Sequence, residues 1–158
     1  MNLGTIAVKN VMTIPPRASV ADAAQTMRET HVGDLVVVDD KRGRAIPIGI
    51  ITDRDISMAT VALRISPEEV CVEDVMSSDL ITARGDDSLT HVIELMKKNA
   101  VKRIPLVGSE GELEGIVTVG DVLNFLFGEF SALARMPQRQ RRNEQLKRGD
   151  EPITLRNM

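Results

Sequence analysis

Aromatic side chains and cysteines are scarce in this sequence, which has no tryptophan, no tyrosine, three phenylalanines and one cysteine. Proteins that bind RNA or single-stranded DNA through stacking platforms need aromatic rings, so this mode of binding is disfavoured. Because Cys71 has no partner for an internal disulfide, the chain suits a reducing compartment. No apolar run approaches the ~20 residues of a membrane span, and Met1–Asn10 lacks a signal-peptide pattern. We therefore expect a cytoplasmic protein with no membrane association.

The composition is otherwise that of a globular protein. The 158 residues are 42% hydrophobic and 27% charged, which allows one sizeable core. The net charge of -3 conceals a basic stretch, Arg135–Arg148, with six basic residues and one acidic residue. We interpret residues 131–158 as a basic tail, helical or disordered. The alternative is a tail that binds nucleic acid or an acidic partner by electrostatic attraction.

One stretch, Ile48–Asp55 (Ile-Gly-Ile-Ile-Thr-Asp-Arg-Asp), combines a short buried strand with the start of a helix. Thr52 is placed to cap that helix, and Asp55 follows at the position of a capping box. The free backbone N–H groups of such a corner attract anions. The corner returns at 114–121, where Gly49, Thr52 and Asp55 recur at one constant spacing as Gly115, Thr118 and Asp121. The chain therefore contains two copies of one unit.

The patterns that flank the corner repeat as well. A helix with apolar residues at i, i+3, i+4 and i+7 is predicted at 19–31, capped by Ser19, and again at 88–100. β-branched runs predict strands at 34–39 and 103–107, and Val11-Met12 is echoed by Val75-Met76. Further helices are expected at about 53–63 and 119–127. Each unit thus runs strand–helix–strand–strand–helix, an α/β fold, and the spacing between the copies drifts along the chain.

Together these signals resemble the cystathionine β-synthase motif (CBS motif), and the two copies resemble a stand-alone tandem CBS pair. We place the first motif at 5–66, the second at 67–130 and the tail at 131–158. The resemblance implies pseudo-twofold symmetry and a non-enzymatic regulatory role. It also implies an adenosyl ligand in the clefts between the motifs (AMP, ADP, ATP or S-adenosylmethionine) and no required cofactor. The ligand would shift the population between two mutual arrangements of the motifs, which an unknown regulated protein recognises.

The same resemblance assigns nucleotide-binding residues to two clefts. The threonine hydroxyls and nearby amides face a phosphate, the aspartates bind the ribose hydroxyls, and the backbone of 32–34 and 101–103 contacts adenine. The first cleft comprises Ile50, Thr52, Arg54, Asp55, Met76, Ile81, Val101, Lys102 and Arg103. The second comprises Met12, Ile14, Val32, Gly33, Asp34, Ile116, Thr118 and Asp121. Simpler alternatives are helix capping for the Thr–Asp pairs and a solvated strand end for Lys102 and Arg103.

Charge distinguishes the two clefts. The first gathers three basic and two acidic groups around Asp55, whereas the second gathers two acidic groups, one of them Asp121, and no basic group. Because a phosphate group carries roughly -1.5 to -2 charges near pH 7, we expect phosphorylated nucleotides in the first cleft. We expect the second cleft to hold an uncharged or cationic adenosine compound, or to stay empty.

Two further features bear on rival functions. His31, His91 and Cys71 have neither metal-ligand spacing nor a catalytic context, so an enzyme that acts on nucleotides is disfavoured. The three phenylalanines at 125–130 crowd one helix end, which fits either a homodimer contact or packing beneath the tail. The remaining rival is an interaction protein whose basic tail binds its partner while the clefts are vestigial.

Overall fold

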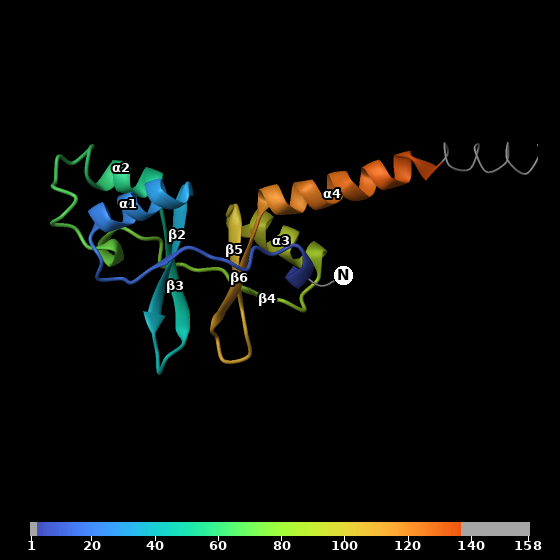
Figure 1. Ribbon diagram of the computed structural model, residues 1–158, viewed down its shortest axis with the longest axis horizontal. Coiled ribbons are helices and arrows are strands. Elements are labelled where there is room, and N and C mark those ends of the chain that lie inside the picture. Colours follow the sequence, from blue (N-terminus) through green and yellow to red (C-terminus); the bar gives the residue numbers. More distant parts are fainter. Residues whose placement is uncertain (1–2, 137–158) are drawn as a thin grey trace, which may run out of the picture. The chain divides into compact units, whose positions relative to one another are not determined.

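The computed structural model describes residues 3–136 of the chain. Two compact units are distinguished, one that ends at Asp121 and holds both β-sheets, and one that starts at Val122 within the last helix. Figure 1 labels the helices and strands. In chain order the elements are η1 (Leu3–Thr5), β1 (Thr13–Ile14), α1 (Val20–Thr30), β2 (Asp34–Asp40), β3 (Ala45–Thr52), α2 (Asp53–Ala59), η2 (Val72–Asp74), β4 (Ala83–Arg84), α3 (Leu89–Asn99), β5 (Arg103–Val107), β6 (Leu113–Thr118) and α4 (Val119–Ala134).

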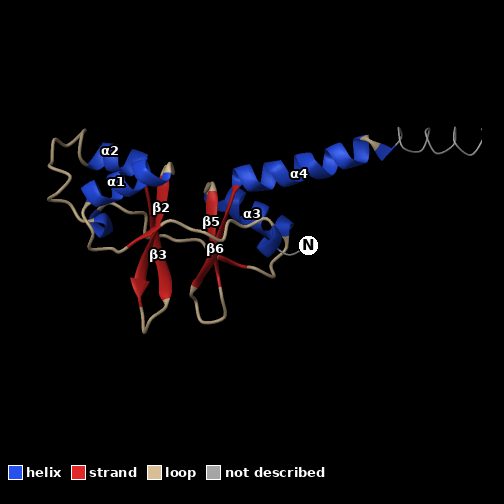
Figure 2. Cartoon of the chain, viewed as in Figure 1, coloured by secondary structure: helices blue, strands red, loops and turns tan. Residues whose placement is uncertain are grey.

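The two three-stranded sheets have the same topology (Figure 2). β1 runs parallel to β2 and β2 antiparallel to β3, and β4, β5 and β6 repeat this arrangement. The register shifts at equivalent places, between Val37 and Val38 in β2 and between Leu106 and Val107 in β5. Each repeat therefore runs strand–helix–strand–strand–helix, and the predicted α/β fold of two such motifs is confirmed.

The core of the first repeat lies where the apolar stripe of α1 meets the sheet. Ser19 and Asp22 form the predicted capping box at the start of α1, and His31 ends the helix in the left-handed region at φ 56°. In the second repeat Ser88 caps α3 and Ala100 ends it at φ 54°. The buried cluster of the first repeat comprises Ile14, Val20, Ala23, Met27, Leu35, Val37, Ile51 and Val72.

The segment that leads into each repeat pairs with the other repeat. Val8 exchanges two backbone hydrogen bonds with Ile116 of β6, at N···O distances of 2.9 and 3.0 Å. Ser77 exchanges the same two bonds with Ile50 of β3, at 2.9 and 3.1 Å. Because backbone pairing crosses in both directions, the two repeats are joined reciprocally, as pseudo-twofold symmetry requires.

These bridges correct the predicted alignment of the two copies. Ser77 takes the place that Val8 holds in the first repeat, so Met76 is the equivalent of Ala7 rather than of Met12. The alignment of Val11-Met12 with Val75-Met76 is therefore wrong, because a recurring dipeptide does not fix a register.

The drift in spacing between the helices and the corners is real and falls in the hairpins. The hairpin beyond the paired residues Val107 and Leu113 is shorter than the one beyond the equivalent pair, Val38 and Pro47. Residues were thus lost or gained at a hairpin end, where the chain tolerates changes in length, while the strands that carry the corners kept their pairing.

Two helices differ from their predicted lengths. α2 ends at Ala59 rather than near residue 63, where the β-branched pair Thr60 and Val61 disfavours a further helical turn. α4 continues to Ala134, past Gly128, rather than ending near residue 127. The division at 5–66, 67–130 and 131–158 stays a prediction, and residues 137–158 of the predicted tail lie outside the described residues.

The reciprocal bridges predict that Gly49 cannot carry a side chain. A Cβ atom there would lie 2.6 Å from the Met76 sulfur and 2.8 Å from the Ser77 carbonyl oxygen. We expect Gly49→Ala to lower the free energy of unfolding by about 1–3 kcal/mol, as overpacking does, measured by urea denaturation. The matched control is Gly128→Ala in α4, where a Cβ would meet nothing within 4 Å and helix propensity should raise stability by roughly 0.5–1 kcal/mol. A Gly49→Ala protein as stable as the wild type would contradict this explanation of the bridge.

Candidate functional site

A cavity of about 250 Å³ opens between the two repeats, within the unit that ends at Asp121. One wall comes from β3 of the first repeat. The other walls come from the segment that leads into the second repeat and from the connection between α3 and β5. The lining residues are Ile50, Thr52, Ser77, Asp79, Leu80, Ile81, Ala100, Val101, Lys102 and Arg103. Neither repeat could build this cavity alone.

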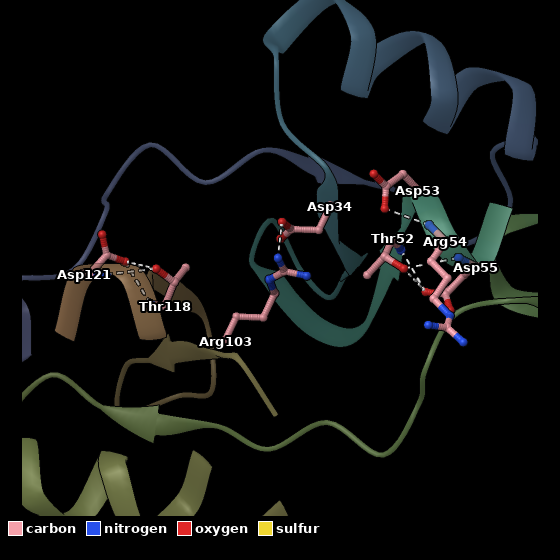
Figure 3. A network of polar contacts seen from close by, with 8 residues as sticks. All are labelled: Asp34, Thr52, Asp53, Arg54, Asp55, Arg103, Thr118 and Asp121. Atoms are coloured by element: carbon pink, nitrogen blue, oxygen red, sulfur yellow. Dashed lines mark hydrogen bonds and ion pairs between the residues drawn. The ribbon is translucent and has the colours of Figure 1, made fainter. Parts of the chain in front are cut away.

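Beside the cavity, Thr52 and Asp55 form a full capping box at the start of α2. The Asp55 N–H donates to the Thr52 hydroxyl at 3.2 Å, while the Thr52 N–H and hydroxyl donate to Asp55 Oδ2 at 2.9 and 2.7 Å. Thr118 and Asp121 form the same three bonds at 3.2, 2.8 and 2.6 Å (Figure 3). The predicted capping role is confirmed, and on each aspartate it engages Oδ2.

An ion pair joins the two repeats between these corners (Figure 3). Arg103 Nη2 lies 3.0 Å from Asp34 Oδ1, and the side chains are only 30% and 21% exposed. Arg103 Nε is buried and has no hydrogen-bond partner among the residues that the structure describes. Desolvation raises the pKa of Asp34, the Arg103 charge opposes that rise, and the nearby Asp53 carboxylate adds to it. The pair therefore does not fully compensate the cost of burying the carboxylate.

The comparison with known families decides the identity of the fold. The CBS domain model matches residues 3–61 and again residues 72–128. The chain belongs to the CBS domain family. It carries two CBS motifs in tandem, as the sequence predicted.

Relatives and solved structures agree with this assignment. Uncharacterized protein MK0525 of Methanopyrus kandleri is 36% identical over 123 residues, which are 78% of this chain and 61% of the relative. The inosine-5'-monophosphate dehydrogenase of Methanocaldococcus jannaschii is 34% identical over 118 residues, 75% of this chain but 22% of that enzyme. The CBS domain pair of protein MJ0100, solved in complex with 5'-methylthioadenosine and S-adenosyl-L-methionine, is 27% identical with a TM-score of 0.71. That match covers 82% of this chain and 98% of the solved chain.

Six of the nine residues predicted for the first cleft line the cavity between the CBS motifs. They are Ile50, Thr52, Ile81, Val101, Lys102 and Arg103. The other three lie elsewhere. Asp55 is half-buried in its capping box, Arg54 is exposed with its N–H bonded to Asp53 Oδ1, and Met76 faces the Cα of Gly49. Their assignment to ligand binding stays a prediction.

Four lining residues are absent from the sequence prediction: Ser77, Asp79, Leu80 and Ala100. Ser77, Asp79 and Leu80 belong to the lead segment that crosses to the other CBS motif, and the mistaken Val-Met alignment concealed its register. Ala100 is the left-handed residue that ends α3, directly before Val101. The predicted end of this helix at residue 100 could have indicated it.

Part of the backbone predicted to contact adenine already accepts hydrogen bonds from the first residues of α2 and α4. The N–H of Asp53 donates to the Gly33 carbonyl at 3.0 Å, and the N–H of Val119 donates to the Lys102 carbonyl at 2.9 Å. The N–H of Val101 donates to the end of α3, at Met96, at 3.1 Å. The Val101 N–H and the Lys102 carbonyl are therefore already bonded. The Val101 carbonyl and the Lys102 N–H, which form the peptide group between the two residues, are left for a ligand.

The second predicted cleft corresponds to the first through the pseudo-twofold relation. Met12, Val32, Gly33 and Asp34 are the equivalents of the cavity-lining residues Ile81, Val101, Lys102 and Arg103, while Ile116 and Thr118 are those of Ile50 and Thr52. Ile14 instead belongs to the buried core cluster of the first CBS motif, and Asp121 is engaged in its capping box. The assignment of these residues to a binding site also stays a prediction.

Residues 3–136 offer neither a membrane-spanning helix nor a metal centre. No helix in this range is long and apolar enough to cross a membrane. In the same residues no group of three or more His, Cys, Asp or Glu side chains gathers where a metal ion could bind.

Proposed function

We propose that this CBS pair is a non-enzymatic regulatory module that binds an adenosyl ligand in the cavity between its two motifs. The observation that carries the proposal is the origin of the cavity walls, which come from both motifs and include six of the residues that the resemblance to the CBS motif implied. A ligand that contacts both motifs has different affinities for their alternative arrangements, so it shifts the population between them. A regulated protein that recognises one arrangement then reads the ligand concentration.

The chemistry of the walls suits a nucleoside. Ile50, Leu80, Ile81 and Val101 offer aliphatic surfaces that can sandwich a base, which replaces the aromatic stacking that this sequence lacks. The Thr52 hydroxyl and the Lys102 ammonium supply polar contacts at the rim. The cavity volume of about 250 Å³ is slightly below the roughly 300–1,000 Å³ of most small-molecule sites, which favours a nucleoside-sized ligand over a dinucleotide.

Asp55 belongs to the proposal as the ribose ligand. Its capping bonds use Oδ2, so Oδ1 can accept hydrogen bonds from a ribose diol, as acidic residues do in dinucleotide-binding folds. The complex of the MJ0100 pair with adenosyl compounds supports the ligand class. AMP, ADP, ATP and S-adenosylmethionine all belong to it, and a sensor of cellular energy state would select among the first three.

A thermal-shift panel tests the proposal directly. Adenosine, 5'-methylthioadenosine, S-adenosylmethionine, AMP and ATP are each added at up to millimolar concentration. At 100 times its dissociation constant, a ligand that binds only the native state stabilises it by about 2.7 kcal/mol. We expect at least one compound to raise the melting temperature measurably. The absence of a shift with every compound would overturn the proposal.

A paired substitution locates the binding event. Ser77 lines the cavity and is exposed, whereas its exposed neighbour Ser78 is absent from the lining. We expect Ser77→Trp to fill the cavity and abolish the ligand-induced shift, and the control Ser78→Trp to retain it. A folded Ser77→Trp protein with the full shift would place the ligand elsewhere.

Self-association through α4 is part of the same proposal. Apolar side chains recur on one face of this helix and are 44–73% exposed, at Leu123, Leu126, Phe127, Phe130 and Leu133. Four of them, together with Asn124, line a shallow hollow. An exposed apolar stripe of this length is typical of a protein–protein contact. We propose that a second copy of the chain covers it.

Phe127→Glu tests this contact, because Phe127 is 73% exposed in the single chain. A charge in a dry interface costs several kcal/mol, so light scattering should report a dimer for the wild type and a monomer for the variant. Ala132→Glu, an exposed α4 position away from the apolar stripe, is the matched control and should remain dimeric. A folded Phe127→Glu dimer would mean that the contact lies elsewhere.

A further inference from the structure

The two members of the Asp34–Arg103 ion pair stand at equivalent positions of the two CBS motifs. Asp34 is the first residue of β2, and Arg103 is the first residue of β5, the equivalent strand of the second motif. At equivalent positions next to a pseudo-twofold axis, two copies of one residue would face each other. The chain instead carries opposite charges there, and they meet at 3.0 Å.

Arg103 takes part in two environments at once. It lines the cavity between the CBS motifs, and its Nη2 is held by Asp34 of the other motif. Its buried Nε has no partner among the described residues. Since a guanidinium has five N–H donors, Arg103 keeps unused donor capacity beside the cavity.

The ion pair changes the charge that a ligand meets in the cavity. The sequence suggested a surplus of basic groups, from Arg54, Lys102 and Arg103. In the structure Asp34 compensates Arg103, Arg54 is absent from the lining, and Asp79 adds an acidic group to it. Lys102 and Asp79 offset each other, so the lining together with Asp34 provides no net positive charge for a phosphate.

We propose that Asp34 sets the ligand-charge selectivity of the cavity by competing with a ligand phosphate for Arg103. This inference rests on the proposed function of the cavity. An uncharged adenosyl ligand binds without disturbing the ion pair. A phosphorylated ligand that takes the Nη2 donor of Arg103 for a charge-assisted hydrogen bond draws Arg103 away from Asp34.

Releasing Arg103 has a cost that falls on Asp34. The carboxylate is only 21% exposed and lies in the field of the Asp53 carboxylate. Removing the partner of a partly buried charge is much less favourable than exchanging partners at the surface. The wild-type protein therefore discriminates against phosphorylated ligands relative to adenosine, and Asp34 is the residue responsible.

The test measures the affinities for adenosine and AMP by calorimetry and compares their ratio. Asp34→Asn removes the competing charge, so we expect the affinity for AMP relative to adenosine to rise about tenfold, the scale of one charge-assisted hydrogen bond. The control is Asp86→Asn, which removes the same charge from an exposed Arg84–Asp86 ion pair outside the cavity lining. It should leave the ratio unchanged.

The double variant Asp34→Asn/Arg103→Gln completes the cycle, and it also removes the unpaired arginine that could destabilise the single variant. If Asp34 acts through Arg103, Asp34→Asn should raise the ratio in the wild-type background and leave it nearly unchanged in the Arg103→Gln background. An unchanged ratio in Asp34→Asn, or an equal rise in both backgrounds, would overturn the inference. Adenosine binding by the wild type would still support the proposed function in that case. Failure of the wild type to bind adenosine and AMP, together with no thermal shift for any compound of the panel, would overturn both.

Discussion

Reciprocal backbone pairing is the constraint on which the rest of this structure depends. The lead segment of each CBS motif crosses to the third strand of the other, Val8 to Ile116 and Ser77 to Ile50. Each third strand would otherwise present unpaired backbone groups along that edge. The crossing explains the glycine in both strands, because a side chain at Gly49 would meet Met76 and Ser77. It also builds the cavity, since the crossing segment supplies one of its walls.

In a duplicated chain whose two copies pack against each other, like charges at equivalent positions can repel. Any charged residue near the pseudo-twofold axis faces its own equivalent unless the two copies diverge. Here they have diverged to Asp34 and Arg103, and at the hairpins Arg44 of the first motif pairs with Glu110 of the second. Exposed pairs contribute little to stability, so Arg44–Glu110 favours correct pairing more than it stabilises. The half-buried Asp34–Arg103 pair lies beside the cavity, where we propose that it affects which ligands bind.

Local patterns in the sequence predict most of the fold. The 3.6-residue periodicity, the Ser19 and Thr52 caps and the β-branched runs each depend on neighbouring residues, and the structure confirms them. The sequence underestimates the length of α4, because Gly128 does not interrupt a helix at an exposed position.

The site is predicted less completely because it depends on long-range pairing. The recurring Val-Met dipeptide placed the segments that lead into the two motifs in the wrong register. Ser77, Asp79 and Leu80 were therefore missed as lining residues. The Asp34–Arg103 contact was not foreseen, because the sequence assigned its two members to different clefts. Sequence spacing alone does not state which side chains meet across an axis. For the same reason the sequence overestimates the positive charge of the first cleft, because it does not show that Asp34 pairs with Arg103.

Contact of one ligand with both CBS motifs is tested most directly by amide chemical shifts during a titration with adenosine. We expect the amides of Ile50 and Thr52 in the first motif and those of Ile81 and Val101 in the second to shift together, with one common dissociation constant. Shifts confined to one motif, or separate dissociation constants for the two sets of amides, would contradict a shared site.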